Sequence, residues 1–484
     1  MNTKLNARTL AIVAGAQFAL RAFAAEGVAN PTDAEEIAAL KKEIQALEKK
    51  VNRLEQPPSP QVEALDQKVW VLERERETDR DAVAAAKTQS KISFGANGFS
   101  FNSADSNFVA QLHGQVQLDS RTFFQDGGIN GNDGFLLRRA RPIFTGTLFR
   151  DFDFNFTPDF GGSTVQIFDA YLNYRYNDAL QLEAGKFKAP IGLEELQNDV
   201  WLSFNERSLV TDLVPNRDIG LQLHGAFLDS AISYALAVVS GGADYSGTTI
   251  NSPIEDDKAF EGRVFFQPWI NSSVKAVRGL GFGVGGSYLA NHPASSSTGL
   301  TPGDTTDGQQ KFFTYNAGVN ANGGGWRVSP QAYYHYGPFS LLGEYVISDQ
   351  QVASATKLAD LQNSAWETSG GWVLTGEDAS YNGVNPRHSF DPRNHHWGAL
   401  QVVARCAVLD VDSRAFSDGF ASSAKSADGA GAWSVGLNWY LNKSLRANMS
   451  FSHTEFRGFT GRASPGVVLA QAENVLFTRL QLAF

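Results

Sequence analysis

The sequence of 484 residues has a single cysteine, Cys406, so an internal disulfide is impossible. It has only two methionines, and no stretch approaches the roughly 20 consecutive apolar residues that a transmembrane helix requires. Basic residues form no concentrated run, and the net charge is −10. These absences exclude a disulfide-stapled scaffold and a helical membrane protein, and they give no support to a nucleic-acid partner.

Catalytic motifs are also missing. Neither H-E-x-x-H nor G-x-S-x-G occurs, and no glycine group is followed by the Lys-Ser/Thr of a phosphate-cradling loop. The densest group of candidate catalysts or metal ligands comprises His388, Asp391, His395 and His396, in a polar segment where solvated loop residues are expected. We therefore predict no enzymatic activity, no cofactor and no metal site.

Aromatic residues and glycines are abundant: 34 Phe, 13 Tyr, 9 Trp and 46 Gly favour strands, turns and interfacial aromatic belts. From residue 108 to residue 121, apolar and polar side chains alternate. One face carries Phe108, Ala110, Leu112, Val116 and Leu118; the other carries Gln111, His113, Gln115, Gln117, Asp119 and Arg121. Such a strand suits lipid on one side and water on the other.

The same alternation recurs along the rest of the chain and gives about sixteen strands. After 108–121 these are 137–148, 151–157, 165–176, 180–184, 219–227, 232–238, 260–266, 280–288, 328–336, 339–347, 366–374, 398–406, 433–439, 445–451 and 475–484. The last strand has an apolar face and ends on Phe484, so we expect it to pair with the first and close the sheet.

The strands of a soluble β-sandwich also alternate apolar and polar side chains, so the connections are needed to distinguish a sandwich from a barrel. Tight turns alternate with long polar segments at about 189–217, 241–258, 290–325, 376–396 and 411–431, which we place on the external rim. The inward faces are polar, whereas a sandwich needs them apolar. We predict an all-β, 16-stranded antiparallel transmembrane β-barrel spanning residues 91–484, in the outer membrane of a Gram-negative cell.

The N-terminal part has another pattern. Lys4, Arg8, an apolar run at 10–20 and a small-residue motif ending at Ala24 predict a signal peptide over residues 1–24. In residues 25–90, apolar residues recur at steps of three and four, which predicts a periplasmic coiled coil and oligomerisation. An amphipathic helix packed on its own barrel is the alternative.

The most charged of the predicted strands lies at residues 135–150, which include Arg138, Arg139 and Arg141. If Ala140 faces lipid, Arg139 and Arg141 face the lumen, where arginine rings select anions. Alternatively, these arginines lie at a rim or pair with acids such as Asp153 or Asp169.

Several motifs occur in a definite order after residue 92. They are Arg138-Arg139-Ala140-Arg141, Phe149-Arg150-Asp151-Phe152, Phe168-Asp169-Ala170, Ala184-Gly185-Lys186-Phe187, Gly192-Leu193-Glu194, Asn205-Glu206-Arg207, Leu374-Thr375-Gly376-Glu377 and Gly436-Leu437-Asn438-Trp439-Tyr440. In this order they resemble the phosphate- and polyphosphate-selective outer-membrane porins. The resemblance implies a homotrimer of sixteen-stranded barrels, one pore per subunit, and an inward loop after Lys188. It also implies that Arg139 and Arg207 line the constriction and that Asp169 lies beside the binding site.

The sequence departs from that family where charge matters most. Asp153 and Glu195 stand where the resemblance implies lysines, Asn198 and Asp199 stand where it implies serines, and Gln115 replaces a basic residue. At an effective dielectric constant near 20, a carboxylate about 4 Å from a phosphate oxygen costs on the order of 4 kcal/mol.

We therefore expect a passive diffusion channel for small hydrophilic or charged solutes with a constriction of mixed charge. Its expected residues are Arg139, Arg141, Lys186, Lys188 and Arg207 against Asp153, Asp169, Glu194 and Glu195. Two alternatives stay open: a true phosphate- or polyphosphate-selective anion channel, and a barrel-anchored surface protein that tethers peptidoglycan. In each case we expect contact with outer-membrane lipid.

Overall fold

The computed structural model describes residues 31–54, 60–87, 90–95, 98–124, 131–162, 164–241, 258–290, 303–458 and 472–484. Contacts divide the chain into two units, residues 1–86 and residues 87–484. The predicted signal peptide, residues 1–24, lies outside the described residues.

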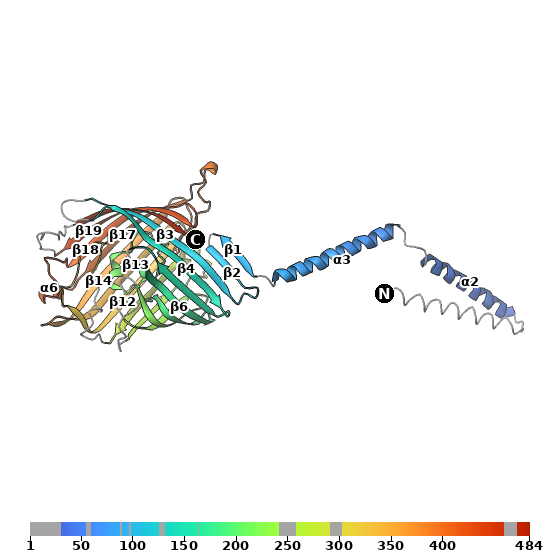
Figure 1. Ribbon diagram of the computed structural model, residues 1–484, viewed down its shortest axis with the longest axis horizontal. Coiled ribbons are helices and arrows are strands. Elements are labelled where there is room, and N and C mark those ends of the chain that lie inside the picture. The colour runs from blue at the N-terminus through green and yellow to red at the C-terminus, as the bar shows by residue number, and fades with distance from the viewer. Residues whose placement is uncertain are drawn as a thin grey trace. The chain divides into compact units, whose positions relative to one another are not determined.

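The first unit contains helices α2 (Pro31–Leu54) and α3 (Pro60–Lys87) (Figure 1). Apolar side chains that define the predicted heptads are largely exposed, for example 50 % at Leu40, 57 % at Leu47 and 65 % at Leu65. Within the described part of the chain, no helix is long and apolar enough to span a bilayer. The coiled coil itself remains a prediction, because it needs a partner helix.

In the second unit, sixteen strands of the described residues form one closed antiparallel ring (Figure 1). The ring comprises β3 (Val109–Phe123), β4 (Gly134–Leu148), β5 (Phe152–Asp159), β6 (Gln166–Asn177), β7 (Leu180–Lys188), β8 (Arg217–Phe227), β9 (Ile232–Val239), β10 (Ala259–Phe266), β11 (Leu280–Leu289), β12 (Asn320–Tyr336), β13 (Phe339–Ala353), β14 (Leu358–Val373), β17 (Ala399–Asp410), β18 (Gly429–Tyr440), β19 (Leu445–Arg457) and β20 (Ala472–Ala483). β20 pairs with β3 from Val475↔Phe123 to Ala483↔Gln115 and closes the ring. The sixteen-stranded barrel is confirmed, and the β-sandwich alternative is wrong.

Alternation along the strands produces an apolar outside. On β3, Val116 and Leu118 are 42 % and 46 % exposed, whereas the intervening Gln117 and Asp119 are fully buried. Because successive side chains of a strand point to opposite faces, the exposed set faces lipid and the polar set faces the lumen.

A hairpin outside the ring was not expected from the sequence. It consists of β1 (Lys91–Gly95) and β2 (Gly98–Asn102), and β2 pairs with the first four residues of β3. Gly98 is required there, because its φ is +79° and a Cβ would lie 2.2 Å from the Leu112 carbonyl oxygen. The hairpin extends the sheet beside the barrel, next to one rim.

Counting strands places each connection on a rim, because consecutive connections of an antiparallel barrel alternate between the two ends. Segments 149–151, 178–179, 337–338 and 441–444 share one rim, which we assign to the periplasm. Segment 374–398 follows the twelfth ring strand and lies on this same rim. Our placement of 376–396 on the external rim is therefore wrong, because it used length and ignored strand parity.

The connection between β7 and β8 folds into the barrel and carries α4 (Leu193–Leu196) and the 3-10 helix η1 (Leu209–Leu213). We call residues 189–216 the inward loop. Its Leu209 and Val210 are fully buried against the inner side of β13, β14 and β17, where Val346 and Ala365 are also fully buried. Burying one such side chain stabilises by about 1.5–3 kcal/mol. This part of the barrel wall is thus an apolar surface against which the loop packs.

Smaller elements complete the connections. They are β15 (Ala379–Ser380), β16 (Gly383–Val384), α5 (Lys275–Arg278), α6 (Arg414–Ser417) and the 3-10 helix η2 (Pro392–Asn394).

Candidate functional site

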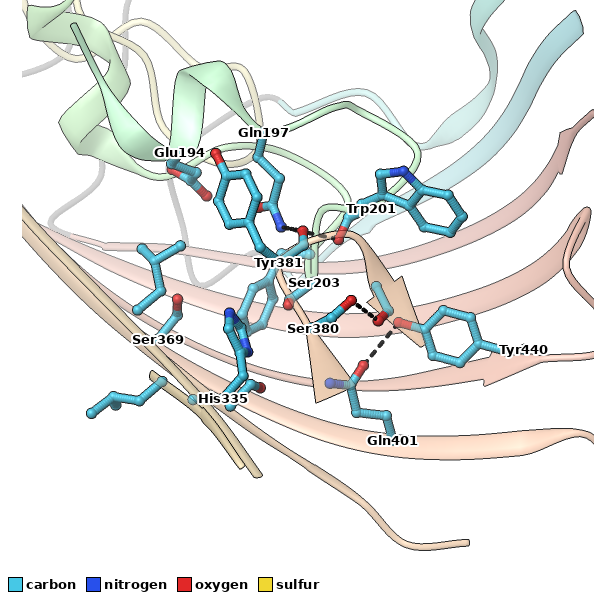
Figure 2. Close-up of a pocket in the computed structure, with 16 residues that line it drawn as sticks. Glu194, Gln197, Trp201, Ser203, His335, Ser369, Ser380, Tyr381, Gln401 and Tyr440 are labelled. Carbon is cyan, nitrogen blue, oxygen red and sulfur yellow. Dashed lines mark hydrogen bonds between the residues drawn. The ribbon is translucent and has the colours of Figure 1, made fainter. Parts of the chain in front are cut away.

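Two elements enter the lumen from opposite rims and meet inside it. The β15–β16 hairpin brings Tyr381 to the inward loop, where its hydroxyl donates to the Leu193 carbonyl at 2.6 Å. The Gln197 amide donates to the Tyr381 carbonyl, also at 2.6 Å (Figure 2). The cavity left beside them measures about 30 Å³, room for about one water molecule. This cavity is therefore too small for a hydrated solute.

The start of the inward loop is fixed by an acid from the barrel wall. Glu344 on β13 accepts hydrogen bonds from the backbone N–H groups of Leu193 and Glu194, at 2.9 and 3.0 Å, and from the Ser329 hydroxyl at 2.7 Å. These bonds satisfy N–H groups that a helix start leaves free. The loop backbone is thus held at a defined place against the wall.

Three arginines converge on one carboxylate of the inward loop. Asp199 Oδ2 contacts Arg141 Nη1 and lies 3.2 Å from Arg139 Nε, and Asp199 Oδ1 lies 2.6 Å from Arg207 Nη1. Burial disfavours the Asp199 charge, but the arginines outweigh it and hold its pKa well below the usual range. Asp199 is therefore a permanent anion among guanidinium groups.

Each of these arginines has a second partner. Arg139 donates to the Gln117 side chain at 2.7 Å, Arg141 donates to Asp159 at 2.7 Å, and Arg207 lies 3.1 Å from Glu195. The three guanidinium groups therefore do not depend on Asp199 alone.

Asp169 has its own cation. Arg217 at the start of β8 donates to Asp169 at 2.9 and 3.3 Å. The Phe168 ring lies beneath two guanidinium groups, with Arg141 at 3.9 Å and Arg217 at 4.6 Å from its centroid. An arginine over an aromatic face is attracted by the ring quadrupole. The ring therefore holds the guanidinium groups of Arg141 and Arg217, and Asp169 also holds that of Arg217.

The other expected constriction residues are distributed unevenly. Lys188 donates to the Glu195 and Gln197 carbonyls at 2.7 and 2.9 Å, whereas Lys186 is buried on β7. Glu194 lies 3.1 Å from Arg405 of β17. Asp153 lies near the periplasmic rim, 3.5 Å from Arg175, and makes no ion pair with the arginines around Asp199.

Sequence reasoning missed Arg138 as a lumen residue. The β3–β4 register shifts between the pairs Gln117↔Arg139 and Leu118↔Leu137, which leaves Arg138 as the extra residue of a bulge. A bulge re-aims a side chain, and Arg138 donates to Glu206 at 2.7 and 3.0 Å. Strict alternation would have turned this arginine toward lipid.

Glu206 is a second centre of pairing that the sequence did not reveal. Arg121 lies 3.2 Å and Arg479 lies 3.4 Å from its carboxylate, in addition to Arg138. Burial opposes its ionisation, yet Arg138 and Arg139 hold its pKa below the usual range. Glu206 thus ties the inward loop to β3, β4 and β20.

A second inward segment, residues 303–313, packs against the inward loop. Its Asp307 carboxylate accepts a hydrogen bond from Arg405 at 2.7 Å, and the Thr305 N–H donates to Asp212 of η1 at 3.0 Å. Burial raises the pKa of Asp304 to about 7, and burial and the nearby Asp304 raise the pKa of Asp212. Both Asp304 oxygens are buried without a hydrogen-bond partner. The two loops therefore meet at a pair of acids that favours a bound proton.

The histidine group lies in segment 374–398. The His388 and His396 rings stack with centroids 4.3 Å apart. Among the residues that the structure describes, no group of three or more His, Cys, Asp or Glu side chains is placed to hold a metal ion.

On the external side of the inward loop, the arginine cluster around Asp199 borders a cavity of about 310 Å³. Its lining combines guanidinium groups, such as Arg138 and Arg217, with carboxylates and with the hydroxyls of Ser208, Thr211 and Thr305. A closed barrel with an apolar outside, a charged lumen and inward loops defines an outer-membrane channel protein of the porin class.

Comparison with known proteins places the chain within this class. Residues 110–484 match the family model described as phosphate-selective porin O and P, and the chain belongs to that family. Porin O of Pseudomonas aeruginosa is 24 % identical over 382 residues, which cover 73 % of this chain and 84 % of that protein. Among solved structures, the outer membrane channel DcaP of Acinetobacter baumannii superposes with a TM-score of 0.50 at 11 % identity, covering 79 % of this chain and 99 % of that one. The protein is an outer-membrane porin.

Proposed function

We propose that this porin is a passive diffusion channel for small hydrophilic solutes, with weak charge selectivity instead of a phosphate site. One observation carries the proposal: the arginines of the constriction are matched by carboxylates of the same chain. Asp199 pairs with Arg139, Arg141 and Arg207, and Asp169 pairs with Arg217. Asp159 also pairs with Arg141, and Glu195 also pairs with Arg207, so four carboxylates face these four arginines. A phosphate would have to displace a covalently held carboxylate at each of these pairs.

The charge balance supports the same conclusion. Selectivity follows the local potential of charged side chains at the narrowest point, so paired charges of both signs leave a weak net field. Our proposed pore-lining set remains Arg139, Arg141, Lys186, Lys188 and Arg207 with Glu194, Glu195, Asp169 and Asp153. To it we add Arg138, Arg217, Asp159, Asp199 and Glu206, which makes seven basic and seven acidic side chains.

We expect a zero-current potential near zero for the purified porin in a planar bilayer between unequal KCl solutions. Chloride and potassium both pass a constriction whose charges are balanced, so neither dominates the current. A potential close to the Nernst potential of chloride would contradict this proposal. That outcome would instead favour the second candidate, a phosphate-selective channel, which the family relationship supports.

For the whole assembly, we propose a homotrimer of barrels covering residues 91–484, after removal of the signal peptide at residues 1–24. Residues 25–90 would form a periplasmic coiled coil between the protomers. The exposed Leu40, Leu47 and Leu65 support this, because an isolated helix gains nothing by exposing such a stripe. Peptidoglycan contact through these helices is the third candidate role.

A further inference from the structure

The carboxylate of Asp199 occupies the place that a small anion would take among the constriction arginines. Both oxygens form ion pairs: Oδ2 with Arg139 and Arg141, and Oδ1 with Arg207. The residue is 4 % exposed, and its side chain borders the 310 Å³ cavity on the external side of the loop. This geometry is that of a ligand in a basic site, with the ligand supplied by the protein.

The chain on either side of Asp199 is tied down, so the carboxylate is presented at a fixed point. The Asn198 side chain accepts from the Val200 N–H at 3.1 Å, which fixes the turn. From the barrel wall, Gln481 of β20 donates to the Val200 carbonyl at 3.1 Å, and Gln117 of β3 donates to the Asp199 carbonyl at 3.5 Å. These three bonds place the carboxylate and do not use its oxygens.

The site can survive without its internal ligand. Arg139 keeps Gln117, Arg141 keeps Asp159, and Arg207 keeps Glu195 when Asp199 is neutral. Removing Asp199 therefore converts a matched cluster into one with an excess of positive charge and a free space of carboxylate size. Arginine forks bind carboxylates with paired, charge-assisted hydrogen bonds.

We propose that Asp199 is a tethered counter-ion that fills an anion site formed by Arg139, Arg141 and Arg207, and that it sets the selectivity of the channel. This inference rests on the proposed function, because it explains why a cluster of arginines leaves the pore weakly selective. The site is suited to a small monocarboxylate, and acetate is the simplest free ligand that replaces the Asp199 side chain.

The test compares Asp199→Asn with Asp153→Asn, which removes the same charge from the lumen at a pair outside the cluster. The chloride-to-potassium permeability ratio is measured from the zero-current potential in a KCl gradient. In Asp199→Asn this ratio should be about tenfold above that of the native channel, because the lost negative charge lies in direct contact with the arginines. Asp153→Asn should change the ratio much less. Equal shifts in the two variants would overturn the inference, because lumen charge in general would then explain the effect.

A second measurement does not depend on conduction. In Asp199→Ala, potassium acetate should raise the thermal unfolding temperature relative to potassium chloride at equal ionic strength, whereas the native protein should respond equally to both salts. An Asp199→Ala protein indifferent to acetate would overturn the inference. Strong anion selectivity of the native channel would instead overturn the proposed function, so the two failures are distinguishable.

Discussion

Replacing Arg479 with methionine should destabilise the barrel by about 3–5 kcal/mol, because it leaves a buried carboxylate without its counter-ion. Arg479 and Asp119 face each other across the seam where β20 meets β3, and both side chains are 0 % exposed. The guanidinium donates to the two Asp119 oxygens at 2.6 and 2.7 Å. Urea-induced unfolding of the refolded protein, followed by tryptophan fluorescence, measures the change.

The matched control for this seam pair is Arg175→Met. Arg175 and Asp153 also form an ion pair, but they lie 3.5 Å apart and are 42 % and 29 % exposed. Such a pair contributes about 0–1 kcal/mol. If Arg479→Met were no more destabilising than Arg175→Met, the buried pair would not hold the seam. The double variant Arg479→Met with Asp119→Leu should recover most of the loss, because no charge is left unpaired.

Raising the pH should loosen the contact between segment 303–313 and the inward loop. The docked pKa of Asp304 is about 7, above the value of 3.8 expected for the free side chain, so docking favours the protonated acid. The contribution of Asp304 to docking is therefore complete below about pH 4, falls as the pH rises from 4 to 7, and is lost above that. The shift corresponds to at most about 4 kcal/mol at 1.36 kcal/mol per pKa unit.

Hydrogen exchange at the Thr305 and Phe312 amides reports this docking, since these groups donate to Asp212 and to the Asp304 carbonyl. After correction for the intrinsic exchange rate, protection should fall between pH 4 and pH 7. Asp304→Asn should reduce the pH dependence to the part that the buried Asp212 contributes, whereas Asp418→Asn, at an exposed pair with Lys357, should leave it in place. Protection that rises with pH would contradict the account.

The fold was largely predictable because alternation is a local property of each strand. The strands of the closed ring, the polar lumen and the pairing of the last strand follow from side-chain order along segments such as 108–121. The inward loop after Lys188 followed from the family resemblance. Segment 374–398 was misplaced because its rim depends on strand parity, and parity requires every earlier strand to be counted.

The charge partners at the constriction were not predictable in the same way. Alternation predicts that Arg139 and Arg141 face the lumen, and the structure places both beside Asp199. Arg138 joins them through a β-bulge, which no residue type in the sequence indicates. The partner of the arginine cluster, Asp199, lies 58 residues from Arg141 in the chain and reaches it only because the inward loop folds back. The apolar surface on the barrel wall against which that loop packs was missed, because Val346 and Ala365 are residue types common in any strand and do not indicate a loop that packs on them.

The central claim is that the constriction arginines are already occupied by the chain's own carboxylates. Phosphate titration of the chloride current through single channels in a planar bilayer tests it most directly. We predict that micromolar phosphate leaves the chloride conductance of the native porin unchanged. Saturable block by micromolar phosphate would show that the arginines bind a free anion despite Asp199, and would contradict the account.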